Sequence, residues 1–234
     1  MTETRITLVT GANKGLGLQT ARSLVAAGHT VYLGARDARR GQEAASAIGA
    51  RPLLLDVTSD ESVAAAAALV ERESGRLDVL VNNAGVGGTY KEANEITAAD
   101  MIEVYDTNVF GVVRVMRAFL PLLLAGKRPA VVNVSSGMGS LAVTSDPDRF
   151  ESALVLPAYT SSKTALNMLT SQYAKAFPGI RINAVDPGFT ATDINGHQGT
   201  RTVEEGAEII VRTAAAVTDD TTGGFLDSRG VVPW

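Results

Sequence analysis

The chain has 234 residues, of which 45% are hydrophobic and 20% charged, and its formal net charge is -4. This length suits one globular domain, and the negative charge argues against a nucleic-acid-binding surface, which would need clustered basic residues. We find neither a signal peptide nor an apolar run of the roughly 20 residues that a membrane span needs. Because there is no cysteine and His29 lies far from His197, we expect no disulfide and no metal site. These features indicate a cytoplasmic protein of one domain.

The first residues have the pattern of a strand, a glycine-rich turn and a helix. A β-prone run over 5–9 leads into the turn TGANKGLG, and apolar residues at helical spacing follow as far as Gly28. Glycines let the backbone approach a pyrophosphate, and a helix that begins there offers free N–H groups. We therefore predict a dinucleotide phosphate site, with an ordinary glycine-rich turn as the alternative. Its candidate residues are Gly11, Asn13, Lys14, Gly15, Leu16 and Gly17.

A second strand over 30–35 ends just before Arg36 and Asp37. In dinucleotide-binding folds this position meets the adenosine ribose, where a carboxylate binds the 2′-hydroxyl and an arginine accommodates a 2′-phosphate. Arg36 and Lys14 would converge on such a phosphate, which favours NADPH over NADH. Asp37 is the counter-evidence if its carboxylate faces the ribose, although Asp is also a common N-cap for the polar helix that follows.

Two further strands, over 51–55 and 78–81, also end in candidate cofactor residues. After the first, Asp56 could accept a hydrogen bond from an adenine amino group while Val57 packs on the ring. After the second, the small turn formed by Asn83, Ala84 and Gly85 could lie against a flat cofactor. Asn82 could equally be structural, tying adjacent strands together.

A long helix is predicted over 97–124, with Asn108 interrupting its apolar face. This residue is either a core asparagine with its hydrogen bonds satisfied or one that holds a water beside an active site. A strand over 130–134 then runs into Ser135 and Ser136. The stretch 138–158 shows no clear helical stripe, and we expect a surface loop over the cleft.

Tyr159 and Lys163 stand four residues apart in a helix predicted over 158–177, so their side chains share one face. A neighbouring ammonium favours the phenolate, lowers the phenol pKa from about 10 and allows proton exchange with a substrate oxygen. After this helix we predict a strand over 180–185, a polar loop that starts at Asp186, a helix over 203–217 and a short closing strand.

Strands that alternate with helices predict an α/β domain with a doubly wound, mostly parallel sheet of about seven strands and helices on both faces. Ligands in such sheets lie beyond the carboxyl ends of the strands. The residues that fall at those ends are Gly11 to Gly17, Arg36, Asp56, Asn83, Ser136 and Pro187. Four motifs in order, TGANKGLG, NNAG, YTSSK and DPG, resemble those of the short-chain dehydrogenase/reductase family over essentially the entire chain. The residues around Lys14 and Arg36 look most like the NADPH-dependent carbonyl reductases.

The resemblance implies an oxidoreductase with a catalytic tetrad formed by Asn108, Ser136, Tyr159 and Lys163, with Ser136 preferred to Ser135. It also implies that Tyr159 and Lys163 contact the cofactor, and that Pro187, Gly188, Thr190 and Thr192 line the nicotinamide amide and the diphosphate. The alternatives are an NAD-dependent alcohol dehydrogenase and a non-catalytic NADP(H)-binding regulator.

Two expectations concern partners. Apolar residues in the expected substrate pocket, Leu141, Leu154, Leu156 and Phe189, indicate a small, uncharged and fairly hydrophobic carbonyl or alcohol compound. The stretch between Ser136 and Tyr159 lies near the helix pair by which many members of the resembled family dimerise, and a homo-oligomer is therefore one expected state.

Overall fold

The computed structural model describes residues 4–216 and 220–234 and contains one eight-stranded sheet. The strand order is β3-β2-β1-β4-β5-β6-β7-β8, and only the last pair is antiparallel. The strands are β1 Ile6–Val9, β2 Thr30–Ala35, β3 Arg51–Leu54, β4 Val79–Asn82, β5 Ala130–Val134, β6 Arg181–Val185, β7 Phe225–Asp227 and β8 Gly230–Val231. The prediction of about seven strands was close, and the addition is the two-residue β8.

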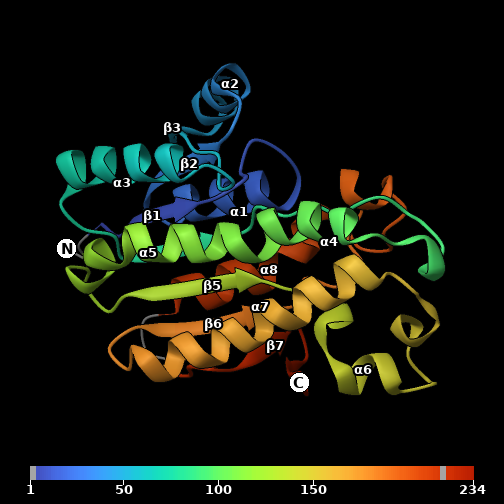
Figure 1. The fold of residues 1–234 in the computed structure, drawn as a ribbon. Helices are drawn as coiled ribbons and strands as arrows, with labels where there is room; N and C mark the ends of the chain where they lie inside the picture. Colours follow the sequence, from blue (N-terminus) through green and yellow to red (C-terminus); the bar gives the residue numbers. More distant parts are fainter. Residues whose placement is uncertain (1–3, 217–219) are drawn as a thin grey trace.

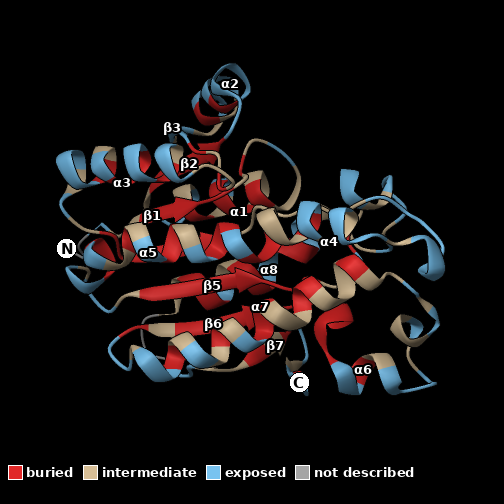
Figure 2. Cartoon of the chain, in the orientation of Figure 1, coloured by how far each residue is buried: buried red, intermediate tan, exposed pale blue. Residues whose placement is uncertain are grey.

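Helices cover both faces of this sheet (Figure 1). One face carries α1 Gly15–Ala26, α2 Ala38–Ile48 and α8 Val203–Ala215, and the other carries α3 Asp60–Ser74, α5 Gly111–Leu124 and α7 Pro157–Ala176. Successive side chains of a strand point to opposite faces, so Leu80 joins one apolar core while Val79 and Val81 join the other. Burial on both faces explains why these strands are continuous apolar runs (Figure 2).

The predicted helix over 97–124 is interrupted in its middle. Helix α4 Ala98–Tyr105 passes into a π-helical turn, η2 Asp106–Phe110, before α5 begins. By length and composition the run Ala98–Leu124 could cross a membrane, contrary to our expectation that no such stretch exists. However, half of its most apolar window is buried in the fold, and α5 packs in the apolar core.

The stretch 138–158 was wrongly predicted to be a surface loop. It contains the end of a 3-10 turn η3 Gly137–Gly139, a short helix α6 Leu141–Ser145, a 3-10 turn η4 Phe150–Ala153 and the start of α7. The carboxyl-terminal residues hold it in place, since the Ser140 hydroxyl donates to the Pro233 carbonyl at 2.7 Å and the Ala142 N–H to that of Trp234 at 3.2 Å. Contacts between residues so far apart in sequence leave no local pattern to predict. The helix predicted over 203–217 is α8, which ends at Ala215, and Val217 lies outside the described residues.

Candidate active site

Two loops at the carboxyl edge of the sheet lie against the glycine-rich turn. A Cβ atom placed on Gly11 would lie 2.9 Å from the Ala84 Cα, in the turn after β4. A Cβ atom on Gly15 would lie 3.7 Å from the Thr192 methyl group, in the loop after β6. The structure therefore brings together the predicted phosphate turn, the NNAG turn and the loop that follows Pro187.

Asn83 supports the glycine-rich turn from behind. Its side-chain amide donates to the carbonyls of Thr10 at 2.9 Å and Gly11 at 3.1 Å. A Cβ atom on Gly17 would lie 2.4 Å from this amide nitrogen, so only glycine fits at the start of α1. The turn thus keeps a backbone cradle that suits a pyrophosphate, while a direct contact of Asn83 with a cofactor stays a prediction.

The residues predicted to contact the adenosine part of the cofactor differ from one another in burial and in hydrogen-bond partners. Asp37 accepts from the Arg40 N–H at 2.9 Å and so is the N-cap of α2, while Arg36 is exposed. Asp56 is partly buried, which raises its pKa, but hydrogen bonds from Thr58 and the charge of Arg36 lower it below its usual value. Val57 is only 8% exposed and belongs to the apolar core, so its side chain has little surface left for an adenine ring.

Lys14 does not lie where we expected it. Its ammonium pairs with the Asp193 carboxylate at 2.5 Å, and Asp193 also accepts from His197 at 2.8 Å. Lys14 therefore faces the loop after β6 in the protein alone, and its convergence with Arg36 on a 2′-phosphate stays a prediction. The pair is exposed to solvent, which screens it, so Lys14 can exchange this partner for a phosphate at little cost.

Helix α7 places Tyr159 and Lys163 on one face, as their spacing predicted. The Lys163 ammonium nitrogen lies 5.7 Å from the centre of the Tyr159 ring and donates to the Val134 carbonyl at 2.8 Å. Only 5% of Lys163 is exposed. Pro157 begins this helix, a position where proline is favoured because no N–H partner is needed.

Burial shifts the pKa values of these two residues in opposite directions. It raises the pKa of Tyr159 to about 12, although a hydrogen bond with Ser136 lowers it, and it lowers the pKa of Lys163 to about 8. We expected Lys163 to lower the pKa of Tyr159. In the protein alone this expectation is wrong, because the cost of burying a phenolate is larger than the stabilisation by neighbouring groups.

The two adjacent serines have separate roles. The Ser135 hydroxyl is buried and donates to the Asn167 side chain at 2.6 Å. Ser136 is partly exposed, accepts from the Met138 N–H at 3.2 Å and hydrogen-bonds Tyr159. Ser136 is therefore the serine that lies beside Tyr159.

Asn108 lies in the π-helical turn and is fully engaged by the protein. Its side chain accepts from the Val86 N–H at 2.9 Å and donates to the Val86 carbonyl and the Ser162 hydroxyl, both at 3.0 Å. A Cβ atom on Gly85 would lie 3.4 Å from the Asn108 carbonyl oxygen and 3.7 Å from the Lys163 ammonium nitrogen. Asn108 thus has the contacts of a satisfied core asparagine and also lies near Lys163, so a water between them stays a prediction.

Two residues around the DPG motif, Asp186 and Arg201, were not among the predicted catalytic or cofactor-binding residues. Asp186 is buried, accepts from the Gly188 N–H at 2.9 Å and is hydrogen-bonded by the Gly137 N–H, but we had assigned it no role. Arg201 donates to the Pro187 carbonyl at 3.2 Å. An acidic residue directly after a buried strand was the available signal for Asp186. Of the predicted loop residues, Thr190 turns its hydroxyl toward the carbonyls of Pro187 and Gly188.

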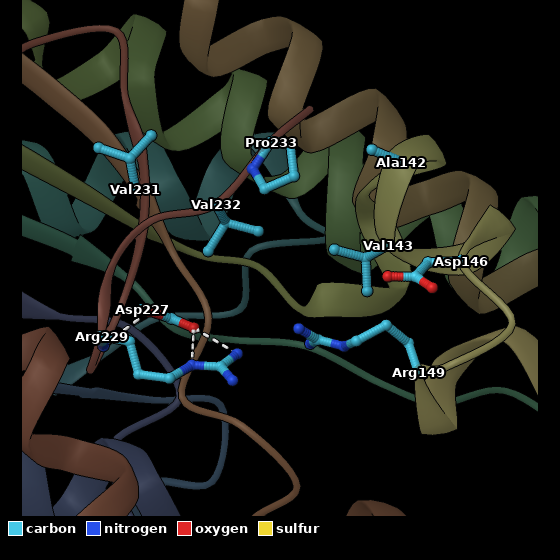
Figure 3. A pocket seen from close by; sticks show the side chains of 9 residues that line it. All are labelled: Ala142, Val143, Asp146, Arg149, Asp227, Arg229, Val231, Val232 and Pro233. Atoms are coloured by element: carbon cyan, nitrogen blue, oxygen red, sulfur yellow. Dashed lines mark hydrogen bonds and ion pairs between the residues drawn. The ribbon is translucent and has the colours of Figure 1, made fainter.

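Two cavities lie near the carboxyl ends of β6 and β7, and none of the predicted apolar pocket residues, Leu141, Leu154, Leu156 and Phe189, lines either of them. One, of about 260 Å3, is lined by Arg149, Glu151, Asp186, Gly188, Arg201, Asp227, Ser228 and Arg229. The other, of about 210 Å3, shares three of these residues and extends to α6 and the carboxyl terminus. Figure 3 shows Arg149 on one side of it and the bonded pair Asp227 and Arg229 on the other.

Sequence comparison identifies a family of known proteins to which this chain is similar. The sequence profile described as short chain dehydrogenase matches residues 5–202. The chain belongs to the short-chain dehydrogenase family. A short-chain dehydrogenase from Penicillium roqueforti is 37% identical over 222 residues, covering 89% of this chain and 88% of the relative. The (+)-neomenthol dehydrogenase of Arabidopsis thaliana is 34% identical, with 96% of each chain covered.

Solved structures of short-chain dehydrogenases and reductases extend the likeness to the fold. An NADPH-bound carbonyl reductase from chicken fatty liver has a TM-score of 0.86 and 31% identity, covering 99% of this chain and all of the other. Salutaridine reductase from Papaver somniferum has a TM-score of 0.83 and 29% identity, covering 94% of this chain and 99% of the other. Members of this family are nicotinamide-dependent oxidoreductases, and we conclude that this chain is one of them.

Proposed function

We propose that this short-chain dehydrogenase reduces an aldehyde, ketone or quinone to an alcohol with NADPH. The observation that carries the proposal is the cluster of Ser136, Tyr159 and the buried Lys163 at the same sheet edge as the glycine-rich turn. A nicotinamide dinucleotide, when bound, supplies the hydride. Residues of the turn would hold its diphosphate, Lys163 its nicotinamide ribose, and the loop from Pro187 to Thr192 its amide.

The side chains of the cluster perform the rest of the reaction. The Ser136 hydroxyl donates a hydrogen bond to the substrate carbonyl oxygen and stabilises the charge that develops there. Tyr159, whose raised pKa keeps it protonated at neutral pH, gives its proton to that oxygen. The Lys163 ammonium then stabilises the phenolate that remains, and solvent returns the proton. Oxyanion stabilisation and proton transfer each lower the barrier by roughly 3 to 5 kcal/mol.

The activity is tested by NADPH oxidation with a panel of aldehydes, ketones and quinones. Turnover of at least one of these compounds supports the proposal. A chain that binds NADPH but turns over none of them would instead be a non-catalytic regulator. A chain that uses NAD to oxidise alcohols in preference would be an alcohol dehydrogenase.

For the substrate, we propose an uncharged and fairly hydrophobic carbonyl compound. The rings of Phe150 and Phe189 pack with centres 5.6 Å apart, which joins η4 to the loop after Pro187. Both rings are more than one third exposed, and Glu151, the residue after Phe150, approaches Gly137, which follows Ser136. Preferential turnover of charged carbonyl compounds such as sugar phosphates would contradict this substrate class.

The preference for NADPH rests mainly on Arg36, because Asp37 is used as a helix cap and Lys14 is paired with Asp193. The NADPH-bound carbonyl reductase among the structural neighbours supports the same choice.

Arg36→Ala should weaken NADPH binding by roughly 10-fold, about 1.4 kcal/mol, and leave NADH binding unchanged, since only NADPH has the 2′-phosphate. Fluorescence titration measures both affinities, and Arg39→Ala, which removes an exposed arginine paired with Glu43, is the matched control. Equal loss for both nucleotides would contradict this role for Arg36.

A further inference from the structure

Asp186 is a buried carboxylate between β6 and the Pro187 loop, and the proposed reaction gives it no task. It is 8% exposed, and its backbone N–H donates to the Leu226 carbonyl at 2.8 Å, which fixes the residue to the start of the next strand. Burying a carboxylate costs free energy unless it is well hydrogen-bonded, so its partners indicate what it does.

The carboxylate bridges two loops. One oxygen accepts from the Gly188 N–H at 2.9 Å, and the Gly137 N–H also donates to the carboxylate. A Cβ atom on Gly137 would lie only 3.1 Å from the second oxygen. Gly137 follows Ser136 directly, and Gly188 follows Pro187, so one side chain joins the serine loop to the loop predicted to hold the nicotinamide amide.

The Glu151 carboxylate also lies against Gly137, in addition to that of Asp186. A Cβ atom on Gly137 would lie 2.9 Å from a Glu151 carboxylate oxygen, and Arg149 donates two hydrogen bonds that hold Glu151, at 3.0 and 3.2 Å. Gly137 therefore lies in a slot between two carboxylates, and any side chain at this position would collide with them. The backbone that carries Ser136 has little freedom to shift.

We propose that Asp186 is a positioning residue that fixes the Ser136 hydroxyl relative to the Pro187 loop. The claim rests on the proposed function, in which Ser136 contacts the substrate oxygen while the Pro187 loop contacts the nicotinamide. An ionised carboxylate offers two equivalent acceptor oxygens for the two N–H groups, whereas an amide or a protonated carboxyl group offers one good acceptor and turns a donor toward the other. The bridge therefore requires the ionised form.

Asp186 is surrounded by charged and titratable groups from every neighbouring element. They are Arg149 and Glu151 near η4, Tyr159 and Lys163 on α7, Arg201 after β6, and Asp227 and Arg229 at β7. Burial, together with the charges of Glu151 and Asp227, raises the pKa of Asp186, although the Gly188 and Gly137 N–H groups lower it. As the pH falls through this raised pKa, the bridge loses an acceptor and turnover should decrease.

The test compares the wild type with Asp186→Asn and with Asp227→Asn as the matched control. Asp227 is also 8% exposed and lines the same cavity, but among the described residues its carboxylate accepts hydrogen bonds only from Arg229 and Gly230, within its own turn. We expect Asp186→Asn to lower kcat by roughly 10- to 100-fold, since displacement of a reacting group by about 1 Å has effects of this size. We also expect it to remove the acid-side decrease in the pH profile, which a merely structural role would not affect. Asp227→Asn should keep the wild-type kcat near neutral pH and still show the acid-side decrease, at a lower pH because this variant removes a negative charge that raises the pKa of Asp186.

Three outcomes would overturn the proposal: wild-type kcat in Asp186→Asn, an unchanged acid-side decrease, or an equal loss in Asp227→Asn. If Asp186→Asn does not fold, Asp186→Glu replaces it, because this variant keeps the charge but displaces the loops. A lower kcat with the acid-side decrease retained supports the bridge, and a wild-type kcat overturns it.

A second readout separates this proposal from the proposed function. If the wild type reduces no carbonyl compound, the proposed function fails, and NADPH affinity decides the role of Asp186. Weaker NADPH binding in Asp186→Asn, with the control unchanged, supports the bridge because the Gly188 loop has lost its anchor. Equal affinity in all three proteins overturns it.

Discussion

Burial shifts the pKa values of Tyr159 and Lys163, and each shift favours the neutral form of the side chain. A raised phenol pKa suits a proton donor, because Tyr159 retains its proton over the whole neutral range. The lowered pKa of Lys163, about 8, has the opposite consequence, since the ammonium that should stabilise the phenolate loses its proton just above neutral pH. At the residue scale, the working pH of the site is therefore set by the lysine.

We predict that kcat/KM for carbonyl reduction decreases as the pH rises above about 8. The sign follows from Lys163, whose charged form predominates below its pKa of about 8 and disappears above it. Steady-state NADPH oxidation across pH 6 to 10 measures the profile. A profile that stays flat to pH 10 would show that the ammonium is not required in the free enzyme.

The π-helical turn is the main departure from prediction at the scale of an element. One extra residue per turn shifts the helix face only locally, so the apolar periodicity of 97–124 predicted a single helix. The turn directs the Asn108 side chain toward the backbone of Val86, after the NNAG turn, and toward Ser162 on α7. It joins the elements that carry the candidate cofactor and catalytic residues.

Asn108→Ala should therefore destabilise the fold as well as the site. It leaves the Val86 N–H and carbonyl without side-chain partners, and buried groups unpaired in this way cost about 1–3 kcal/mol each. We expect a loss of about 3 kcal/mol in the free energy of unfolding, measured by urea denaturation. The exposed Asn94 is the matched control, and Asn94→Ala should change stability by less than about 0.5 kcal/mol. Equal stability of the two variants would show that the clamp contributes nothing.

At the scale of the whole molecule, a second buried carboxylate holds the N-terminal end of β4. Asp78 is 1% exposed and accepts from the Ile6 N–H at 2.8 Å and the Lys127 N–H at 2.7 Å, with the Arg76 guanidinium at 3.3 Å. It joins the start of β1 to the segment before β5, at the end of the strands opposite to the active site. We assign it to stability alone.

Asp78→Ala should lower the free energy of unfolding by roughly 3–5 kcal/mol, because it removes the acceptor of the Ile6 and Lys127 N–H groups and leaves the Arg76 charge without this partner. The folded fraction should keep its kcat, since Asp78 contacts no candidate catalytic residue. Chemical denaturation and turnover per folded molecule measure the two effects. A variant with normal stability, or with a strongly reduced kcat, would contradict this assignment.

Much of the architecture could be predicted because it is encoded locally. Apolar runs, glycine-rich turns and the four-residue spacing of Tyr159 and Lys163 each lie within one segment, and parallel strands bring their carboxyl ends to one edge. The missed features depend on contacts between distant segments. The Trp234 carbonyl accepts a hydrogen bond from α6, and the Asp193 carboxylate pairs with Lys14. Gly137, the residue after Ser136, lies against the Asp186 carboxylate. Burial likewise reversed the expected pKa shift of Tyr159, and no spacing rule carries that information.

The most direct test of the account is turnover by Tyr159→Phe, with Tyr173→Phe as the matched control. Tyr173 lies on the same helix, is partly buried and stacks on Phe177, so its replacement removes a phenol hydroxyl away from the site. We predict that Tyr159→Phe loses roughly 100- to 10,000-fold in kcat while its NADPH affinity stays at the wild-type value, and that Tyr173→Phe keeps its activity. If Tyr159→Phe retained most of its turnover, Tyr159 would not be the proton donor and the proposed mechanism would be wrong.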